Sequence, residues 1–326
     1  MKKFRSDVLL FIYDKLKEGK VVVKNDILYK FHVNERTFYR YIKNIKDFVE
    51  NTYFGEEIVS DRKKGGYILK GSCDKNLNEK EVLAVSKVLL ESRGFIKTEI
   101  KGIIDKLLDN CICGDKENIK YIIGNEFMNY VPPRHGKELL DSLWKISSAI
   151  KNKSVLEIGY FKIGTDGKLQ RKISKRFVYP QGILFSEYYF YLIAFIEGAS
   201  YEFPAIYRVD RIENLTVTAR KYKEDYRRRF KDGEFRKLIQ FMQAGELERV
   251  KFKYTGRSIE AVLDKLPNAR IIREKPGEYI VKTKVFGRGI KMWLLSQGDS
   301  IEVLGSDKFR KEMIETIDRM REMYRL

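Results

Sequence analysis

Three arginines and a tyrosine in the second half of the chain have side chains suited to binding an anion. Arg208 and Arg211 closely follow an aromatic, apolar run at residues 188–196, Tyr191 lies inside that run, and Arg176 precedes it. A guanidinium group can form paired hydrogen bonds with a phosphate, and a tyrosine ring can stack on a base. These four residues therefore form a candidate effector site for an anionic ligand.

A structural role for the same residues stays open. Asp210 lies between the two later arginines and could pair with either of them, and Tyr191 could be an ordinary core residue. Side chains alternate between the two faces of a strand, so Tyr189, Tyr191 and Ile193 share one face. Only one face can line a pocket, and the sequence leaves open which face it is.

A second set of candidate residues lies near the start of the chain, where side chains could reach DNA. Asn34 is a suitable N-cap for a helix that runs to about residue 50, with Phe38, Ile42 and Ile45 on its inner face. The other face carries types that can reach phosphates and base edges. The candidate DNA-binding residues of this helix are Arg36, Thr37, Tyr39, Arg40 and Lys43.

The elements around that helix predict a winged helix-turn-helix. Residues 7–16 and 24–31 have the apolar spacing of two shorter helices, and residues 57–60 and 67–70 have the pattern of a hairpin. The tip of this hairpin carries Arg62, Lys63 and Lys64. In such a domain the third helix enters the major groove and the hairpin lies beside the backbone, which predicts double-stranded DNA as a partner. Protein binding, or simple packing of the helices against the rest of the chain, remains the alternative.

Two stretches of the N-terminal region resemble DeoR-type regulators. Residues 33–42, VNERTFYRYI, resemble the recognition segment of that family, and residues 65–69, GGYIL, resemble its wing.

A longer stretch, residues 155–222, resembles the WYL family of bacterial transcriptional regulators. The tripeptide Phe190-Tyr191-Leu192 and the later sequence YRVDRI at residues 207–212 are similar to the two motifs that define the family, with Phe190 in place of the tryptophan. Arg176, four residues before Pro180, adds to the match. The resemblance implies a nucleic-acid or nucleotide-like effector, bound at Arg176, Tyr191, Arg208 and Arg211.

The remaining patterns predict a multidomain α+β protein. Five strand-like segments between residues 154 and 218 favour a small antiparallel barrel of the Sm/SH3-like type. Residues 249–324 alternate strands and helices in the order of a ferredoxin-like α+β domain, and residues 292–298 resemble the extension that follows WYL domains. The expected domains are a winged helix at 1–72, a helical connector at 73–152, the WYL domain at 153–224 and a C-terminal extension at 225–326.

The formal net charge of +19 is unevenly distributed along the 326 residues. Residues 73–150 are neutral, and the excess of lysine and arginine lies in the segments before and after them. A polyanion such as nucleic acid explains this pattern, although solvated lysines alone would give the same charge. The neutral segment, which Asn78 is expected to open as a helix cap, fits a spacer or a dimer contact.

The residues that enzymes use most often are sparse. Cys73, Cys111 and Cys113 have no histidine near them, since the two histidines are His32 and His135, so we expect neither a metal site nor a cofactor. No Walker loop or dense carboxylate cluster is present, which makes a nuclease a weak alternative to a regulator. An RNA- or single-strand-binding adaptor without promoter recognition is the other alternative.

Location and assembly follow from the same features. The sequence shows neither a signal peptide nor an apolar run of the roughly 20 residues that cross a membrane, so we expect a cytoplasmic protein. Helix-turn-helix proteins usually read two half-sites through a two-fold axis, which predicts a homodimer.

Overall fold

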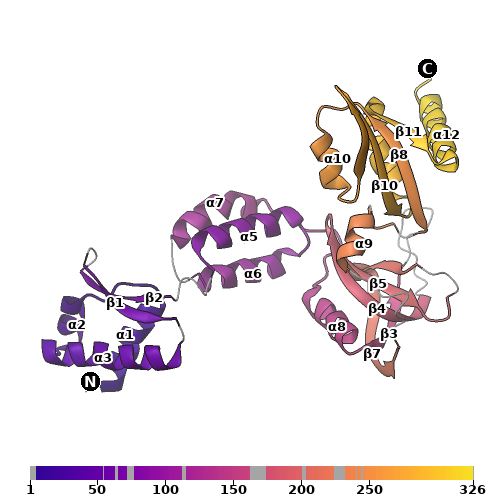
Figure 1. The fold of residues 1–326 in the computed structure, drawn as a ribbon. Helices are drawn as coiled ribbons and strands as arrows, with labels where there is room; N and C mark the ends of the chain where they lie inside the picture. Colours follow the sequence, from indigo (N-terminus) through magenta and orange to yellow (C-terminus); the bar gives the residue numbers. More distant parts are fainter. Residues whose placement is uncertain are drawn as a thin grey trace. The chain divides into compact units, whose positions relative to one another are not determined.

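A computed structural model describes residues 5–53, 55–62, 65–71, 77–111, 115–161, 174–199, 203–223, 232–239, 241–243 and 245–325. The chain divides into two compact units, Met1–Gly136 and Lys137–Leu326. The first unit holds three helices with a hairpin and then three further helices, and the second holds two larger sheets (Figure 1). None of the helices in these described segments is long and apolar enough to span a membrane.

The N-terminal module consists of three helices and a hairpin, as the apolar spacing predicts. The helices are α1 (Arg5–Lys17), α2 (Lys24–Phe31) and α3 (Glu35–Thr52), and the strands β1 (Glu57–Asp61) and β2 (Gly66–Lys70) pair antiparallel. Their shared core is apolar and includes Ile12, Leu16, Ile27, Phe38 and Ile42.

Local contacts fix the ends of these elements. The Asn34 side chain accepts a hydrogen bond of 2.9 Å from the backbone N–H of Thr37, which confirms the predicted cap of α3. The hairpin is held by a bridge between Val22, in the turn after α1, and Tyr67 in β2. Gly66 is required at this contact, since a Cβ there would lie 2.6 Å from the carbonyl oxygen of Val22.

Three helices follow in the first unit: α5 (Glu79–Ser92), α6 (Lys97–Asp109) and α7 (Lys116–Met128). Asn78 caps α5 through the backbone N–H groups of Lys80 and Glu81, as the sequence predicts. The Glu81 side chain completes a capping box, which was not predicted. Cys111 is buried, whereas Cys73 and Cys113 lie outside the described residues.

The second unit begins with α8 (Leu140–Lys151) and a five-stranded antiparallel sheet. Its strands are β3 (Ser154–Tyr160), β4 (Ser174–Ser186), β5 (Tyr189–Ile196), β6 (Ala205–Arg208) and β7 (Ile212–Lys221), with a short 3-10 turn η1 (Val209–Arg211) between the last two. The strand order is β6-β5-β4-β3-β7. Five antiparallel strands were predicted and are present, but the described strands form an open sheet and not the closed barrel that was expected.

Helices cover both faces of this sheet. Ile146 and Ala149 of α8 pack against Leu156, Val178 and Leu192 on one face. Phe235 and Ile239, in and just after α9 (Asp232–Leu238), pack against Leu184 and Ile193 on the other. Helix α8 was assigned from the sequence to the connector, but its buried side chains complete the core of this sheet (Figure 1).

The last module has the element order expected from its sequence. Strand β8 (Leu247–Tyr254), α10 (Ile259–Lys265), β9 (Arg270–Lys275), β10 (Glu278–Phe286), α11 (Gly289–Ser296), β11 (Ile301–Gly305) and α12 (Asp307–Met323) follow one another. The strands form an antiparallel sheet of order β11-β8-β10-β9. Its core joins Phe252 and Val281 to Val262 of α10, Trp293 of α11 and Phe309 of α12, so the helices cover one face of the sheet.

Candidate functional site

The solvent-facing side of α3 carries three of the cations that were predicted to bind DNA. Arg36, Arg40 and Lys43 are exposed and recur at the spacing of one helix face. No described residue forms a hydrogen bond or ion pair with any of these three side chains. The positive charge of this surface is therefore available to a ligand.

The other predicted DNA-binding residues differ in their surroundings. Tyr39 is exposed, and its ring packs edge-on against Phe38 at 5.5 Å between centroids and lies 5.8 Å from the Lys24 ammonium. Thr37 is half-buried in the first turn of α3. Arg62 is exposed at the end of β1, and Lys63 and Lys64 lie outside the described residues.

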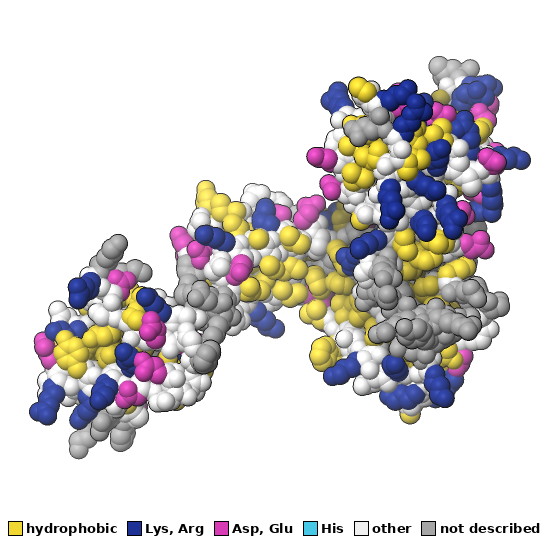
Figure 2. All heavy atoms as spheres, viewed as in Figure 1, with side chains coloured by type: hydrophobic (Ala, Val, Ile, Leu, Met, Phe, Trp, Pro, Cys, Tyr) yellow, Lys and Arg dark blue, Asp and Glu magenta, His cyan; other side chains and the backbone are white. Residues whose placement is uncertain are grey.

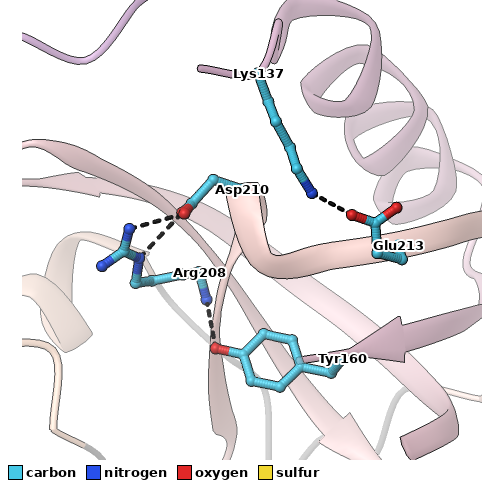
Figure 3. A network of polar contacts seen from close by, with 5 residues as sticks. All are labelled: Lys137, Tyr160, Arg208, Asp210 and Glu213. Carbon is cyan, nitrogen blue, oxygen red and sulfur yellow. Dashed lines mark hydrogen bonds and ion pairs between the residues drawn. The ribbon is translucent and has the colours of Figure 1, made fainter. Parts of the chain in front are cut away.

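In the five-stranded sheet, Arg208 is held by an acid from the next turn of the chain. Its Nε and Nη2 atoms donate to the two carboxylate oxygens of Asp210 at 3.0 and 2.7 Å (Figure 3). The exposed fractions of the two side chains are only 19% and 4%. Burial lowers the pKa of the Arg208 guanidinium, but the bonds to Asp210 outweigh this and leave the pKa raised. Of the two pairings that the sequence allowed, the structure has Asp210 with Arg208.

Arg208 also stacks on an aromatic ring. Its guanidinium carbon lies 3.3 Å from the centroid of the Tyr189 ring, and its Cα is paired across the strands with that of Tyr191. Tyr191 packs beside the apolar cluster under α9, and burial raises the pKa of its phenol against the opposing charges of Arg208 and Arg211. The structure therefore brings Tyr191, Arg208 and Arg211 into one neighbourhood.

Arg176 lies on the opposite face of the sheet. Its Nη1 atom donates to the hydroxyl of Tyr207 at 3.0 Å, and Tyr207 is buried in the cluster under α8. Since Tyr207 and Arg208 are neighbours in one strand, their side chains point to opposite faces. Arg176 therefore does not join the other three predicted effector residues in a single pocket.

Two polar contacts near this site were missed from the sequence. The Tyr160 hydroxyl accepts a hydrogen bond of 3.3 Å from the backbone N–H of Arg208, and Lys137 forms an ion pair with Glu213 at the start of β7 (Figure 3). Lys137 and Glu213 are far apart in the sequence, so no local pattern could pair them. Tyr189, by contrast, could have been predicted as part of this site, because strand alternation places its side chain on the same face as that of Tyr191.

Arg211 is the remaining cation of the motif, and it is half-buried at the end of η1. No described side chain pairs with its guanidinium group, although its carbonyl oxygen accepts a backbone hydrogen bond from Phe161 at 3.2 Å. Among the described residues, Arg211 rather than Arg208 thus has uncompensated charge beside Tyr191. An anion bound on this face would have that guanidinium as its first partner.

Comparison with known proteins matches residues 141–217 to the family described as WYL domain. No curated protein matches the chain. Among solved structures, proteasome accessory factor B/C (PafBC) of Arthrobacter aurescens is similar at 15% identity over 95% of this chain and 45% of that chain, with a TM-score of 0.30. A structure described as a CRISPR Cas-related protein is similar at 18% identity, with 100% and 88% of the two chains covered and a TM-score of 0.35.

This chain thus spans less than half the length of the PafBC chain. The matched segment begins in α8 and ends in β7, so it includes the helix that completes the sheet as well as the Arg208–Asp210 pair. Residues 141–217 of this chain form a WYL domain.

Proposed function

We propose that this protein is a DNA-binding transcriptional regulator whose WYL domain senses an anionic, nucleic-acid-like or nucleotide-like effector. The observation that carries the proposal is the exposed row of Arg36, Arg40 and Lys43 on α3, in a chain that also holds a WYL domain. In this proposal residues 5–70 act as a winged helix-turn-helix of DeoR type, with α3 in the major groove and Arg62 beside the backbone.

The same proposal assigns effector binding to the face of the WYL sheet that carries Tyr191 and Arg211. A phosphate-bearing ligand there would gain charge-assisted hydrogen bonds from Arg211 and ring contact with Tyr191. We propose that the protein acts as a homodimer and that the ferredoxin-like C-terminal modules of the two subunits contact each other. The effector would then regulate DNA binding by favouring one spacing of the two winged helices, which requires different affinities for the two arrangements.

A binding assay with the duplex upstream of the protein's own gene tests the DNA-binding part. Arg40→Ala should weaken duplex binding by roughly 5- to 150-fold, since a base contact from α3 contributes about 1–3 kcal/mol. Lys46→Ala is the matched control, because Lys46 is an exposed cation of the same helix that is paired with Glu50 at 3.6 Å. Equal losses for the two variants would mean that the Arg40 face of α3 does not contact the DNA.

The salt dependence of duplex binding gives an independent measure of how many phosphates the protein contacts. If about six or more phosphates are contacted, duplex affinity should fall on the order of a thousandfold between roughly 50 and 200 mM salt. A flat salt response would contradict phosphate contact by this surface.

A further inference from the structure

The four-stranded sheet of the C-terminal module has one face that its helices leave open. Along β8 the apolar residues Val250 and Phe252 point into the core, and Arg249 and Lys251 alternate with them and are exposed. Along β10 Lys282 and Lys284 are exposed in the same way, between buried Val281, Thr283 and Val285. The open face therefore carries cations at alternate positions in the middle of two neighbouring strands.

The strand register places these cations directly opposite one another. Lys282 is paired with Lys251 on one side and with Arg270 of β9 on the other, and Lys284 is paired with Arg249. We refer to these five residues, Arg249, Lys251, Arg270, Lys282 and Lys284, as the basic ladder. Like charges directly opposite in a sheet are unfavourable, so the ladder lowers the stability of the free protein.

The charges of the ladder are not compensated within the described structure. All five residues are exposed, and no described residue forms an ion pair or hydrogen bond with their side chains. Two acids share this face by strand alternation, Glu302 of β11 and Glu278 at the start of β10. Glu302 is bound to Lys253 at 2.8 Å and to Arg310 at 3.3 Å. Lysine and arginine side chains gather over this module in Figure 2.

The geometry of the ladder suits a linear polyanion. Alternate residues of a strand are about 6.8 Å apart and neighbouring strands about 4.8 Å apart, so the positive charges form a regular array. The centre of a protein–protein interface is depleted of charged residues, whereas the middle of this face is occupied by charged side chains. The aromatic residues Phe252, Tyr254 and Tyr279 of these strands pack on the core side. Phe286, at the end of β10, stacks on Phe235 at 5.5 Å between ring centroids, so its ring is already occupied.

We propose that the basic ladder binds a single nucleic-acid strand through its phosphates, without reading base sequence. This site consists of residues of the C-terminal module and includes no residue of α3 or of the WYL motifs, and the proposal goes beyond the function proposed above. The strand's phosphates would relieve the repulsion between facing cations, in addition to the usual release of counterions.

Fluorescence anisotropy with the full chain and a labelled oligothymidylate of about 20 nucleotides tests the proposal. The ladder variant Lys251→Gln/Lys282→Gln should bind the strand at least tenfold more weakly than the unchanged chain. Because each lost contact with a single strand lowers the salt slope by about 0.7, the slope should fall by about 1.4. An oligocytidylate of equal length should be affected to the same extent, since the bases are not read.

The matched control is Lys308→Gln/Lys311→Gln, which removes two exposed cations from α12 and leaves the ladder intact. Both double variants have the same net charge, so a general electrostatic effect cannot separate them. If they bind the strand with equal affinity and equal salt slope, the proposal is wrong. If the ladder variant loses as much affinity for a duplex as for the single strand, the assignment to a single strand is wrong, whereas Arg40→Ala tests duplex reading separately.

Discussion

The two sheets of the unit Lys137–Leu326 hold their positive side chains in opposite ways. In the WYL sheet Arg208 is largely buried, stacks on Tyr189 and is neutralised by Asp210. In the C-terminal sheet Lys251 and Lys282 are exposed and face each other. The first arrangement compensates a mostly buried charge, and the second lowers the stability of the unbound protein and leaves its charge free.

This difference indicates that the two arginines of one motif, Arg208 and Arg211, need not have the same capacity to bind an anion. A guanidinium that already donates to both oxygens of a carboxylate has little capacity left for a phosphate. Its positive charge is also cancelled at long range, so it contributes little to the field that attracts a polyanion. Affinity for anions should thus follow the uncompensated cations, namely Arg211 in the first sheet and the basic ladder in the second.

The largest effect should come from breaking the buried pair. Asp210→Ala leaves the Arg208 charge without its partner in a mostly buried position, which should lower the free energy of unfolding by about 3 kcal/mol. Glu302→Ala breaks a pair in which both side chains are at least one-third exposed, and should cost less than about 1 kcal/mol. Urea unfolding followed by circular dichroism measures both, and equal losses would contradict the distinction between the two sheets.

The next largest expected effect is a difference in oligonucleotide binding between variants of Arg211 and Arg176. In the Lys251→Gln/Lys282→Gln background, where binding at the C-terminal sheet is weakened, Arg211→Ala should weaken binding of a short oligonucleotide about tenfold, as expected for one charge-assisted hydrogen bond. Arg176→Ala should change it less than twofold, because Arg176 lies on the face under α8 and donates to Tyr207. Calorimetric titration measures both, and a larger loss for Arg176→Ala would place the ligand on the α8 face.

Local features of the fold were the most predictable from the sequence. Asn34 and Asn78 were recognised as caps because an N-cap depends only on the next two or three residues. The strands of the WYL sheet were recognised because aromatic and β-branched residues mark them. Alternation correctly placed Tyr191 on one face and Leu192 on the other.

Features that depend on pairing between distant segments were not predictable. Helix α8 has the apolar pattern of a connector helix, and only the folded sheet shows which surface that pattern covers. The basic ladder is invisible in the sequence, because Lys251, Arg270 and Lys282 become neighbours only through the strand register. Whether Asp210 pairs with Arg208 or with Arg211 depends on the turn η1, which composition does not specify.

A smaller effect should come from relieving the repulsion in the ladder. Lys251→Gln/Lys282→Gln should raise the free energy of unfolding by about 0.5 kcal/mol at low salt, because facing like charges are removed. The gain should disappear at about 1 M salt, where charges are screened beyond roughly 3 Å. Lys308→Gln/Lys311→Gln should leave stability unchanged, and a ladder variant that is less stable than this control would show that the facing cations do not repel.

The smallest effect concerns the pH dependence of the WYL sheet at high pH. Burial raises the pKa of Tyr191 above its usual value of 10.0, so the folded protein holds this proton more tightly than the unfolded chain does. The resulting contribution to stability is complete below about pH 10 and is lost as the pH rises through the folded-state pKa. Tyr191→Phe removes the titrating group, so its free energy of unfolding should fall less between about pH 9 and 11 than that of the unchanged chain. Identical curves would mean that Tyr191 ionises equally easily in both states, and hence that it is more open to water than its packing against Leu184 and Ile193 implies.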